Sequence, residues 1–399
     1  MTGCGVISAI GQGKEAFLGA LLRGDHSFGP LVRPGRVAAT AFIGAEIPTP
    51  VVPERFSRKL LRGVGHSALA ALVVLQEAWD DAQLAGADPE RVGLVVGGSN
   101  VQQRELVLRH EAYRDRPGYL PPTYGMSYLD TDLCGLGTEQ FGIRGPAHTV
   151  GGASASGQLA VIEAARLVRS GEVDACIALG ALADLSHWEL RALRALGAMG
   201  SDRFADRPDL ASRPFDADRD GFVYGEACAA VVVERATAAE ARGAHPYAVI
   251  TGWAVAADGN RNPDPSVAGE ARAVRGALAM AGLPPRRVDY VNPHGTGSGL
   301  GDEVEVAAIR AAGLAHARIN ATKSLTGHGL SAAGAVELVA TLLQMRASTL
   351  HPTRNLDRPI DPALGWVRGR PERHGMTNAV TLSAGFGGLS TALCLRAGA

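Results

Sequence analysis

Aromatic residues are scarce in this 399-residue chain, at 5% of the sequence, although hydrophobic residues make up 46%. A buried core must therefore consist mainly of Ala, Val and Leu. Net charge is also nearly absent: the formal value is -1, and residues of both signs are interspersed along the chain. Because a nucleic-acid-binding protein needs a basic face, we expect no nucleic-acid partner.

Long hydrophobic runs are missing as well. The apolar stretch at 227–233 is far shorter than the ~20 residues that a membrane helix requires. The start of the sequence also lacks the basic segment and apolar run of a secretory signal. We therefore expect a cytoplasmic protein with no membrane partner.

The five cysteines are widely spaced and form no Cys-x-x-Cys pair. A zinc ribbon or a redox motif is therefore not expected, and we predict no metal site. Cys176, Cys228 and Cys394 lie in apolar runs, a context typical of buried reduced thiols.

Strand-like and helix-like segments alternate along the whole chain. Strands are expected at 92–96, 175–179, 228–233, 247–256, 288–292, 318–321 and 380–383. Helices are expected at 157–170, 268–281, 302–312 and 331–346. Such alternation predicts an α/β protein with helices packed on sheets. Because the order of elements repeats, we predict an internal duplication, with an N-terminal half at 1–243 and a C-terminal half at 244–399.

A small-residue loop at 145–157 leads into the first of these helices and contains Ser154 and Ser156. A side chain at this point lies at the positive end of the helix dipole, where a nucleophile or a developing anion is stabilised. The alternative is that both serines only cap the helix. A Gly-x-Ser-x-Gly elbow does not apply, because Ser156 stands where its second Gly should be.

Two further motifs place histidines after strands. His294 enters a Gly-rich turn in the segment 289–298, which Asp302 and Glu305 follow. Lys323 and His328 lie between the strand at 318–321 and the next helix. A histidine at the carboxyl end of a strand, beside glycines that let a ligand approach, is a candidate acid, base or hydrogen-bond donor.

A fourth motif, at 383–390, places three glycines around Phe386 between two apolar strands. This pattern predicts a strained turn or a mobile flap, and an ordinary β-hairpin is the alternative.

Together these four motifs, with the segment 212–226, resemble the elongating β-ketoacyl-acyl carrier protein synthases of fatty-acid and polyketide synthesis. The resemblance covers nearly the whole chain, from 2–8 to 385–388. It implies a thiolase-like duplicated αβαβα sandwich, usually a homodimer. The site lies between the halves and is reached by the phosphopantetheine arm of an acyl carrier protein. The resemblance implies no cofactor of the chain's own, because the carrier protein's arm brings the substrate.

The resemblance also implies roles for individual residues. Ser154 occupies the position of the family's cysteine nucleophile. His294 and His328 are expected to bind the malonyl thioester oxygen, and Lys323 is expected near the site with Glu337 as its ion-pair partner. Thr296 and Ser298 are expected to contact the phosphopantetheine arm. Phe386 is expected to gate the site and to help form the oxyanion hole, and Phe222 is expected to be a second aromatic residue near the pocket.

A serine in place of cysteine changes the expected chemistry. A serine hydroxyl is far less acidic than a thiol and needs an adjacent general base. Loss of CO2 from malonyl-carrier protein needs no nucleophile, only donors aimed at the developing enolate oxygen, and these are retained. The pattern is similar to the serine-variant ketosynthases of polyketide β-branching cassettes, which form acetyl-carrier protein. We therefore predict a malonyl-acyl carrier protein decarboxylase.

Two alternatives remain open from the sequence. The first is a β-ketoacyl synthase or acyltransferase that uses Ser154 as nucleophile and His294 as base. The second is a non-catalytic partner subunit similar to a chain-length factor. Such subunits usually lose the histidines, whereas His294, Lys323 and His328 are all present.

Overall fold

A computed structural model describes residues 1–37 and 41–398 and contains two six-stranded mixed sheets. The first sheet has the order β2-β1-β9-β7-β5-β6 and the second has the order β10-β17-β16-β11-β12-β14. The strands of the first sheet are β1 (Gly3–Ser8), β2 (Gly11–Gln12), β5 (Val92–Gly97), β6 (Ala147–Val150), β7 (Ala175–Gly180) and β9 (Ala227–Glu234). Those of the second are β10 (Ala248–Ala257), β11 (Tyr290–Asn292), β12 (Arg318–Ile319), β14 (Gly365–Trp366), β16 (Asn378–Gly385) and β17 (Leu389–Ala397).

The two sheets repeat one pairing pattern. The pairs β1–β9 and β9–β7 are antiparallel, whereas β7–β5 and β5–β6 are parallel. In the second sheet β10–β17 and β17–β16 are antiparallel, and β16–β11 and β11–β12 are parallel. The predicted internal duplication is therefore confirmed. Gly243 lies between helix α9 (Ala236–Ala241) and β10, and the division into halves at this residue stays a prediction.

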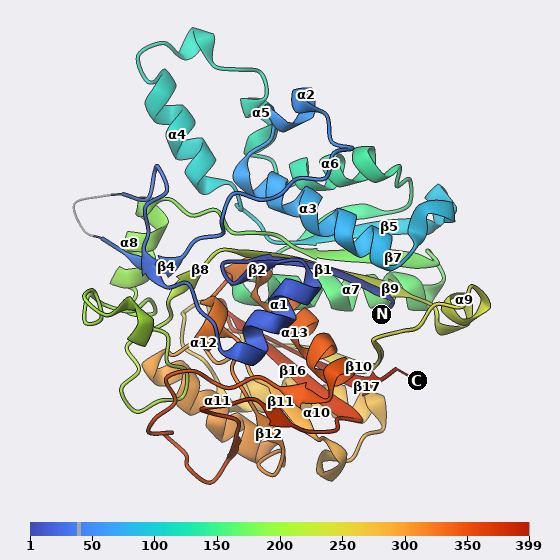
Figure 1. Cartoon of the computed structure of the whole chain (residues 1–399), viewed down its shortest axis with the longest axis vertical. Coiled ribbons are helices and arrows are strands. Elements are labelled where there is room, and N and C mark those ends of the chain that lie inside the picture. The colour runs from blue at the N-terminus through green and yellow to red at the C-terminus, as the bar shows by residue number, and fades with distance from the viewer. Residues whose placement is uncertain (38–40, 399) are drawn as a thin grey trace.

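Helices separate and cover the two sheets, as Figure 1 shows. Helices α3 (His66–Asp81) and α6 (Asp132–Phe141) lie over the outer face of the first sheet. Helices α7 (Ser156–Ser170) and α13 (Ala333–Ala347) lie between the sheets and contact each other. Helices α10 (Val267–Ala281) and α11 (Gly299–Ala311) cover the second sheet from outside. These five layers are the predicted thiolase-like αβαβα sandwich.

The central helix α13 explains why the halves form one core. Its residues from Ala333 to Met345 are all buried, because a helix between two sheets has no face left for solvent. Such a helix is apolar on every side instead of amphipathic. Its partner α7 starts at Ser156, one residue before the predicted start, and α11 begins at Gly299 instead of Asp302.

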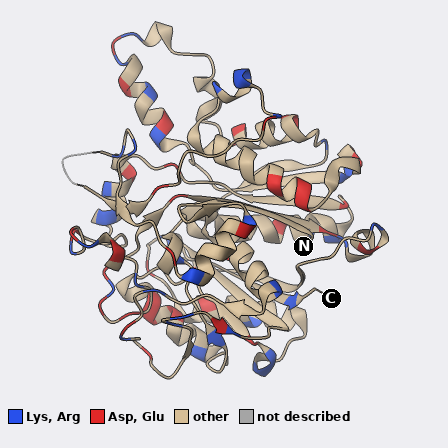
Figure 2. Ribbon diagram, viewed as in Figure 1, with Lys and Arg blue, Asp and Glu red and all other residues tan. Residues whose placement is uncertain are grey.

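The cysteines and the charges follow the sequence expectations within the described residues. All five cysteines are free and buried, and burial raises the pKa of the Cys176, Cys228 and Cys394 thiols to about 12. Basic and acidic residues are mixed over the helices and loops of both halves (Figure 2). In the part of the chain that the structure describes, no helix has both the length and the hydropathy needed to cross a bilayer.

Candidate active site

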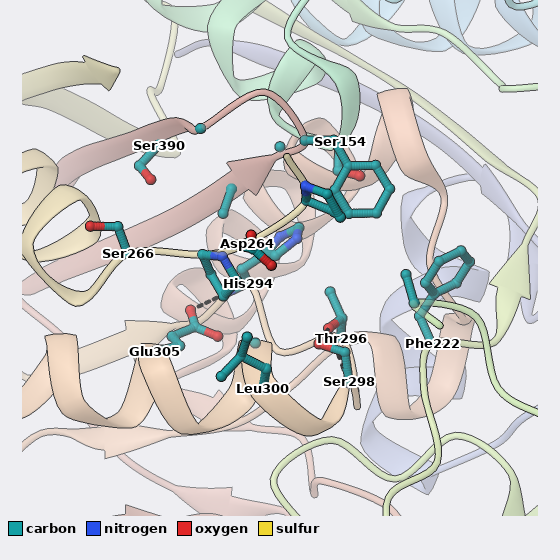
Figure 3. A pocket seen from close by; sticks show the side chains of 18 of the residues that line it. Ser154, Phe222, Asp264, Ser266, His294, Thr296, Ser298, Leu300, Glu305 and Ser390 are labelled. Carbon is teal, nitrogen blue, oxygen red and sulfur yellow. Dashed lines mark hydrogen bonds between the residues drawn. The ribbon is translucent and has the colours of Figure 1, made fainter. Parts of the chain in front are cut away.

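The four motifs meet at one cavity of about 210 Å³ (Figure 3). Strand β6 leads to Ser154, β11 leads to His294, and β12 leads to Lys323 and His328. These strands are parallel to their neighbours within each sheet, so their carboxyl ends lie at corresponding edges, where ligands of α/β sheets bind. The predicted residues that line the cavity are Ser154, Phe222, His294, Thr296, Ser298, His328 and Phe386.

Ser154 sits in a tight 3-10 turn, Ala153–Ala155, directly before α7. Ala153 has a left-handed φ of 48°, a conformation that costs an alanine about 1–2 kcal/mol. Ser156 holds this turn: its Oγ accepts a bond from the Gly152 N–H at 2.9 Å and donates to the Ala153 carbonyl at 2.7 Å. Ser154 takes no part in this bonding, so the two serines have different surroundings and Ser154 faces the cavity.

The Ser154 hydroxyl is hydrogen-bonded to a histidine. Its Oγ lies 2.9 Å from His328 Nε2, while His328 Nδ1 accepts a bond from the Leu330 N–H at 3.3 Å. Since Nδ1 accepts, this hydrogen-bond network assigns the ring proton to Nε2, which then donates to Ser154. In this tautomer, Nε2 cannot accept the serine proton. The arrangement supplies a donor to the cavity and does not activate a nucleophile.

Lys323 holds His294 in place through contacts with its carbonyl group and its ring. The Lys323 ammonium donates to the His294 carbonyl, lies 3.4 Å from His294 Nδ1, and pairs with Glu337. An ammonium at Nδ1 assigns the ring proton of His294 to Nε2. The rings of His294 and His328 are nearly perpendicular, with centroids 5.3 Å apart. Lys323 and Glu337 are buried and do not line the cavity, so both lie outside the space open to a substrate.

Both histidines favour the electrically neutral form. Burial, together with the Lys323 charge, holds the pKa of His294 and of His328 well below the usual value for histidine. A base with a lowered pKa keeps its neutral form to lower pH, so no titration of these rings falls near pH 6.5.

We expect kcat/KM for malonyl-carrier protein to be flat between about pH 6 and pH 8. Rates measured by product mass over this range test this, and a break near pH 6.5 that is lost in His328→Ala would contradict it.

The remaining predicted residues line other parts of the cavity. Phe222 packs edge-on against the His328 ring, with centroids 5.2 Å apart. Phe386 is 38% exposed at the turn of the β16–β17 hairpin, so the hairpin alternative is confirmed for this motif. Thr296 Oγ1 donates to Ser298 Oγ at 3.0 Å, and both line the cavity.

Gly385 brings the end of β16 against the serine loop. A Cβ at this position would lie 2.2 Å from the Gly152 carbonyl oxygen, a distance that real side chains do not reach. Only glycine therefore permits the hairpin and the serine turn to touch, and this contact closes the cavity wall beside Ser154.

Sequence reasoning missed several residues of the cavity, among them a largely buried acidic one. Glu270, in the first turn of α10, lines the cavity and is 9% exposed. It is a single acidic residue at a helix start, which normally indicates only a favourable interaction with the helix dipole. Its position in the cavity depends on packing between segments that are distant in the sequence, so no local sequence pattern indicates it.

Comparisons with known proteins agree with this geometry. Residues 1–239 match the family model "Beta-ketoacyl synthase, N-terminal domain", and residues 247–357 match "Beta-ketoacyl synthase, C-terminal domain". The chain is 58% identical to the Bacillus subtilis protein "Polyketide biosynthesis malonyl-ACP decarboxylase PksF", over 99% of this chain and 95% of that protein. It is 31% identical to the "3-oxoacyl-[acyl-carrier-protein] synthase 2" of Coxiella burnetii, over 99% of this chain and 97% of that protein.

Solved structures show the same fold. A beta-ketoacyl synthase from Burkholderia phymatum superposes with a TM-score of 0.90 at 28% identity, covering 100% of this chain and 98% of that one. A type II polyketide ketosynthase in complex with its acyl-carrier protein, AntDE:AntF, superposes with a TM-score of 0.88 at 26% identity, covering 99% of this chain and 98% of that one.

Proposed function

Because the chain belongs to the β-ketoacyl synthase family, we propose that it is a ketosynthase-like decarboxylase that converts malonyl-acyl carrier protein to acetyl-acyl carrier protein and CO2 in polyketide β-branching. The observation that carries this proposal is the hydrogen bond from His328 Nε2 to Ser154 Oγ. It leaves the serine without a base while it keeps both histidine donors in the cavity. The 58% identity with a malonyl-ACP decarboxylase over 99% of the chain supports the same reaction.

The reaction follows from what the residues offer. The phosphopantetheine arm passes Thr296 and Ser298, and the malonyl thioester oxygen accepts bonds from the Nε2–H groups of His294 and His328. The bond between the carboxylate carbon and the methylene carbon breaks, its electron pair forms the enolate, and CO2 leaves. Neutral donors held in a buried site need no rearrangement as negative charge develops on the oxygen, so they stabilise the transition state more than water does.

Lys323 acts in this scheme through His294 and not on the substrate. It fixes the ring orientation and the proton position of His294 by its contacts with Nδ1 and the carbonyl. Glu337 neutralises the ammonium at a site where both side chains are almost completely buried. The pair is therefore a positioning device for one of the two donors.

The expected partner is an acyl carrier protein, and we propose that the chain forms a homodimer. Strand β6 supports a homodimer, because it forms one edge of the first sheet and is only partly buried. An edge strand of this kind offers its free N–H and C=O groups to a second copy. The cytoplasmic location stays a prediction.

Acyl transfer through Ser154 is the main competing function. It requires His294 or His328 to accept the serine proton, and in the assigned tautomers both rings carry their proton on Nε2. A covalent acyl group on a peptide containing Ser154 would favour this alternative. A non-catalytic subunit is the weaker alternative, because His294, His328 and their Lys323–Glu337 support are all in place.

The proposal is tested by incubating malonyl-loaded acyl carrier protein with the chain and recording intact mass. We expect the carrier protein to lose the mass of CO2 while the enzyme keeps its own mass. An unchanged carrier protein would refute decarboxylation. A β-ketoacyl product, formed when an acyl-carrier protein is also supplied, would show that the chain condenses.

A further inference from the structure

The reaction needs a proton donor that the histidines do not supply. In a condensing enzyme the enolate attacks an acyl group, whereas here its methylene carbon has to take up a proton. His294 and His328 donate to the enolate oxygen and are neutral, so transfer of their protons to carbon would leave an imidazolate. A separate acid within reach of the cavity is required.

Figure 3 shows the buried carboxyl group of Glu305 on the side of His294 away from Ser154. Glu305 accepts bonds from the N–H groups of His294 at 2.5 Å and Gly295 at 2.7 Å. Asp302 likewise accepts from the N–H groups of Phe215 at 2.6 Å and Gly297 at 3.0 Å. Each of these two carboxylates therefore has two backbone donors, which favour its ionised form and oppose the effect of burial, which raises the pKa of Glu305 to about 8 and that of Asp302 to about 6.

Glu270 has no such support. Within residues 1–37 and 41–398, its carboxyl group forms no hydrogen bond or ion pair; the residue is 9% exposed, and its carboxyl oxygens retain some access to the cavity. A largely buried carboxylate that has no donor is costly to ionise, which favours its protonated form. The three carboxyl groups thus divide into two that accept bonds from backbone amides and one, Glu270, that accepts none and has the highest pKa of the three.

A side cavity joins Glu270 to the catalytic residues. It has a volume of about 10 Å³, enough for about one water molecule, and Glu270, Glu305, His294 and Ser390 line both it and the main cavity. Ser383 also lines it, is 2% exposed, and has a hydroxyl oxygen without a partner among the described residues. A buried hydroxyl that lacks a protein partner calls for one, and a single water in the side cavity would bond to Ser383 beside the Glu270 carboxyl group.

We propose that Glu270 is the acid that protonates the enolate carbon, directly or through a single water held by Ser383. This inference rests on the proposed decarboxylation. After CO2 leaves, the methylene carbon forms a bond to the Glu270 proton and becomes the acetyl methyl group. The O–H electron pair stays on the Glu270 carboxylate, which then takes a proton from solvent through the open main cavity.

The titratable groups around Glu270 agree with this role. Glu305 and Asp302 face it from α11, Asp258 faces it from the end of β10, and His294 lies across the side cavity. Burial first, and then the charges of Glu305, Asp258 and Asp302, raise the pKa of Glu270 to about 9. Asp258 is paired with Arg272 at 3.1 Å, and no cation contributes to the shift in the pKa of Glu270. Strands β16 and β17 contribute no charged residue to the side cavity, which they line with Leu382, Ser383, Ala384, Ser390 and Thr391.

The first test compares the wild-type chain with Glu270→Gln, which keeps the shape of the side chain and removes its acidic proton. We expect acetyl-carrier protein formation to fall about 10²-fold, the lower range for general acid catalysis. Glu240→Gln, an exposed glutamate on α9, is the matched control and keeps the wild-type rate. An active wild-type chain with an equally fast Glu270→Gln variant would overturn the role of Glu270 alone. An inactive wild-type chain would instead refute the proposed decarboxylation.

Two further measurements separate an acid from a structural residue. The wild-type rate should fall as pH rises through about 9, because the acid then loses its proton, and Glu270→Gln should lack this limb. Formate should restore part of the rate to Glu270→Ala by entering the vacated space as a small acid, without affecting the wild-type chain. A wild-type rate that stays flat above this pH, with no rescue by formate, would contradict the proposal even if Glu270→Gln fails to fold.

Discussion

Replacing His294 by alanine is expected to lower kcat/KM for malonyl-carrier protein by about 10³-fold, the upper value for loss of one preorganised donor. The cavity would keep its walls, but the thioester oxygen would lose one of its two N–H donors. Because Lys323 would remain behind the vacated ring, the loss is in catalysis and not in assembly of the site. Product mass as a function of time gives the rate.

Two further variants, a control and a partial rescue, show whether the effect is specific to the N–H donor of His294. His245→Ala removes an exposed histidine next to β10 and should leave the rate unchanged. His294→Gln restores an N–H donor at nearly the same reach and should recover part of the lost rate. If His294→Ala keeps the wild-type rate, enolate stabilisation by this ring is refuted.

Breaking the Lys323–Glu337 pair has the second large expected effect, on stability. The side chains are only 2% and 3% exposed, so Glu337→Leu leaves a buried ammonium without its counter-charge. We expect a loss of about 3–5 kcal/mol in the free energy of unfolding, as for other buried pairs that lose one partner. Urea denaturation measures the shift in midpoint and slope.

The double variant Lys323→Met with Glu337→Leu separates stability from activity. It removes both charges, so most of the lost stability should return, while the rate stays low because nothing orients His294. Glu163→Leu is the control, since its pair with Arg166 on α7 is exposed and contributes less than about 1 kcal/mol. A double variant as unstable as Glu337→Leu would show that the ion pair itself is not the source of the loss.

The sequence predicted those parts of the site that follow strands. Ser154, His294 and His328 each come shortly after the carboxyl end of a strand, and the topology of duplicated sheets brings such ends together. Lys323 was expected near the site, but its place behind His294 depends on α13, which carries Glu337. Short-range patterns contain no information about that packing.

Glu270 shows why the remainder could not be predicted. Its surroundings come from α11, β16 and the loop after β11, which are distant in sequence. The absence of a donor to its carboxyl group is a property of those surroundings and not of its neighbours on α10. The tautomer of His328 could not be predicted from the sequence either, since it depends on the backbone N–H of Leu330.

The central claim is that this site removes CO2 without a nucleophile. The most direct test incubates malonyl-loaded acyl carrier protein with the wild-type chain and with Ser154→Ala, and compares the rates of acetyl-carrier protein formation by intact mass. The two rates should agree within about threefold, since the hydroxyl that His328 contacts is not an essential donor. Loss of decarboxylation in Ser154→Ala, or an acylated wild-type enzyme, would contradict the account.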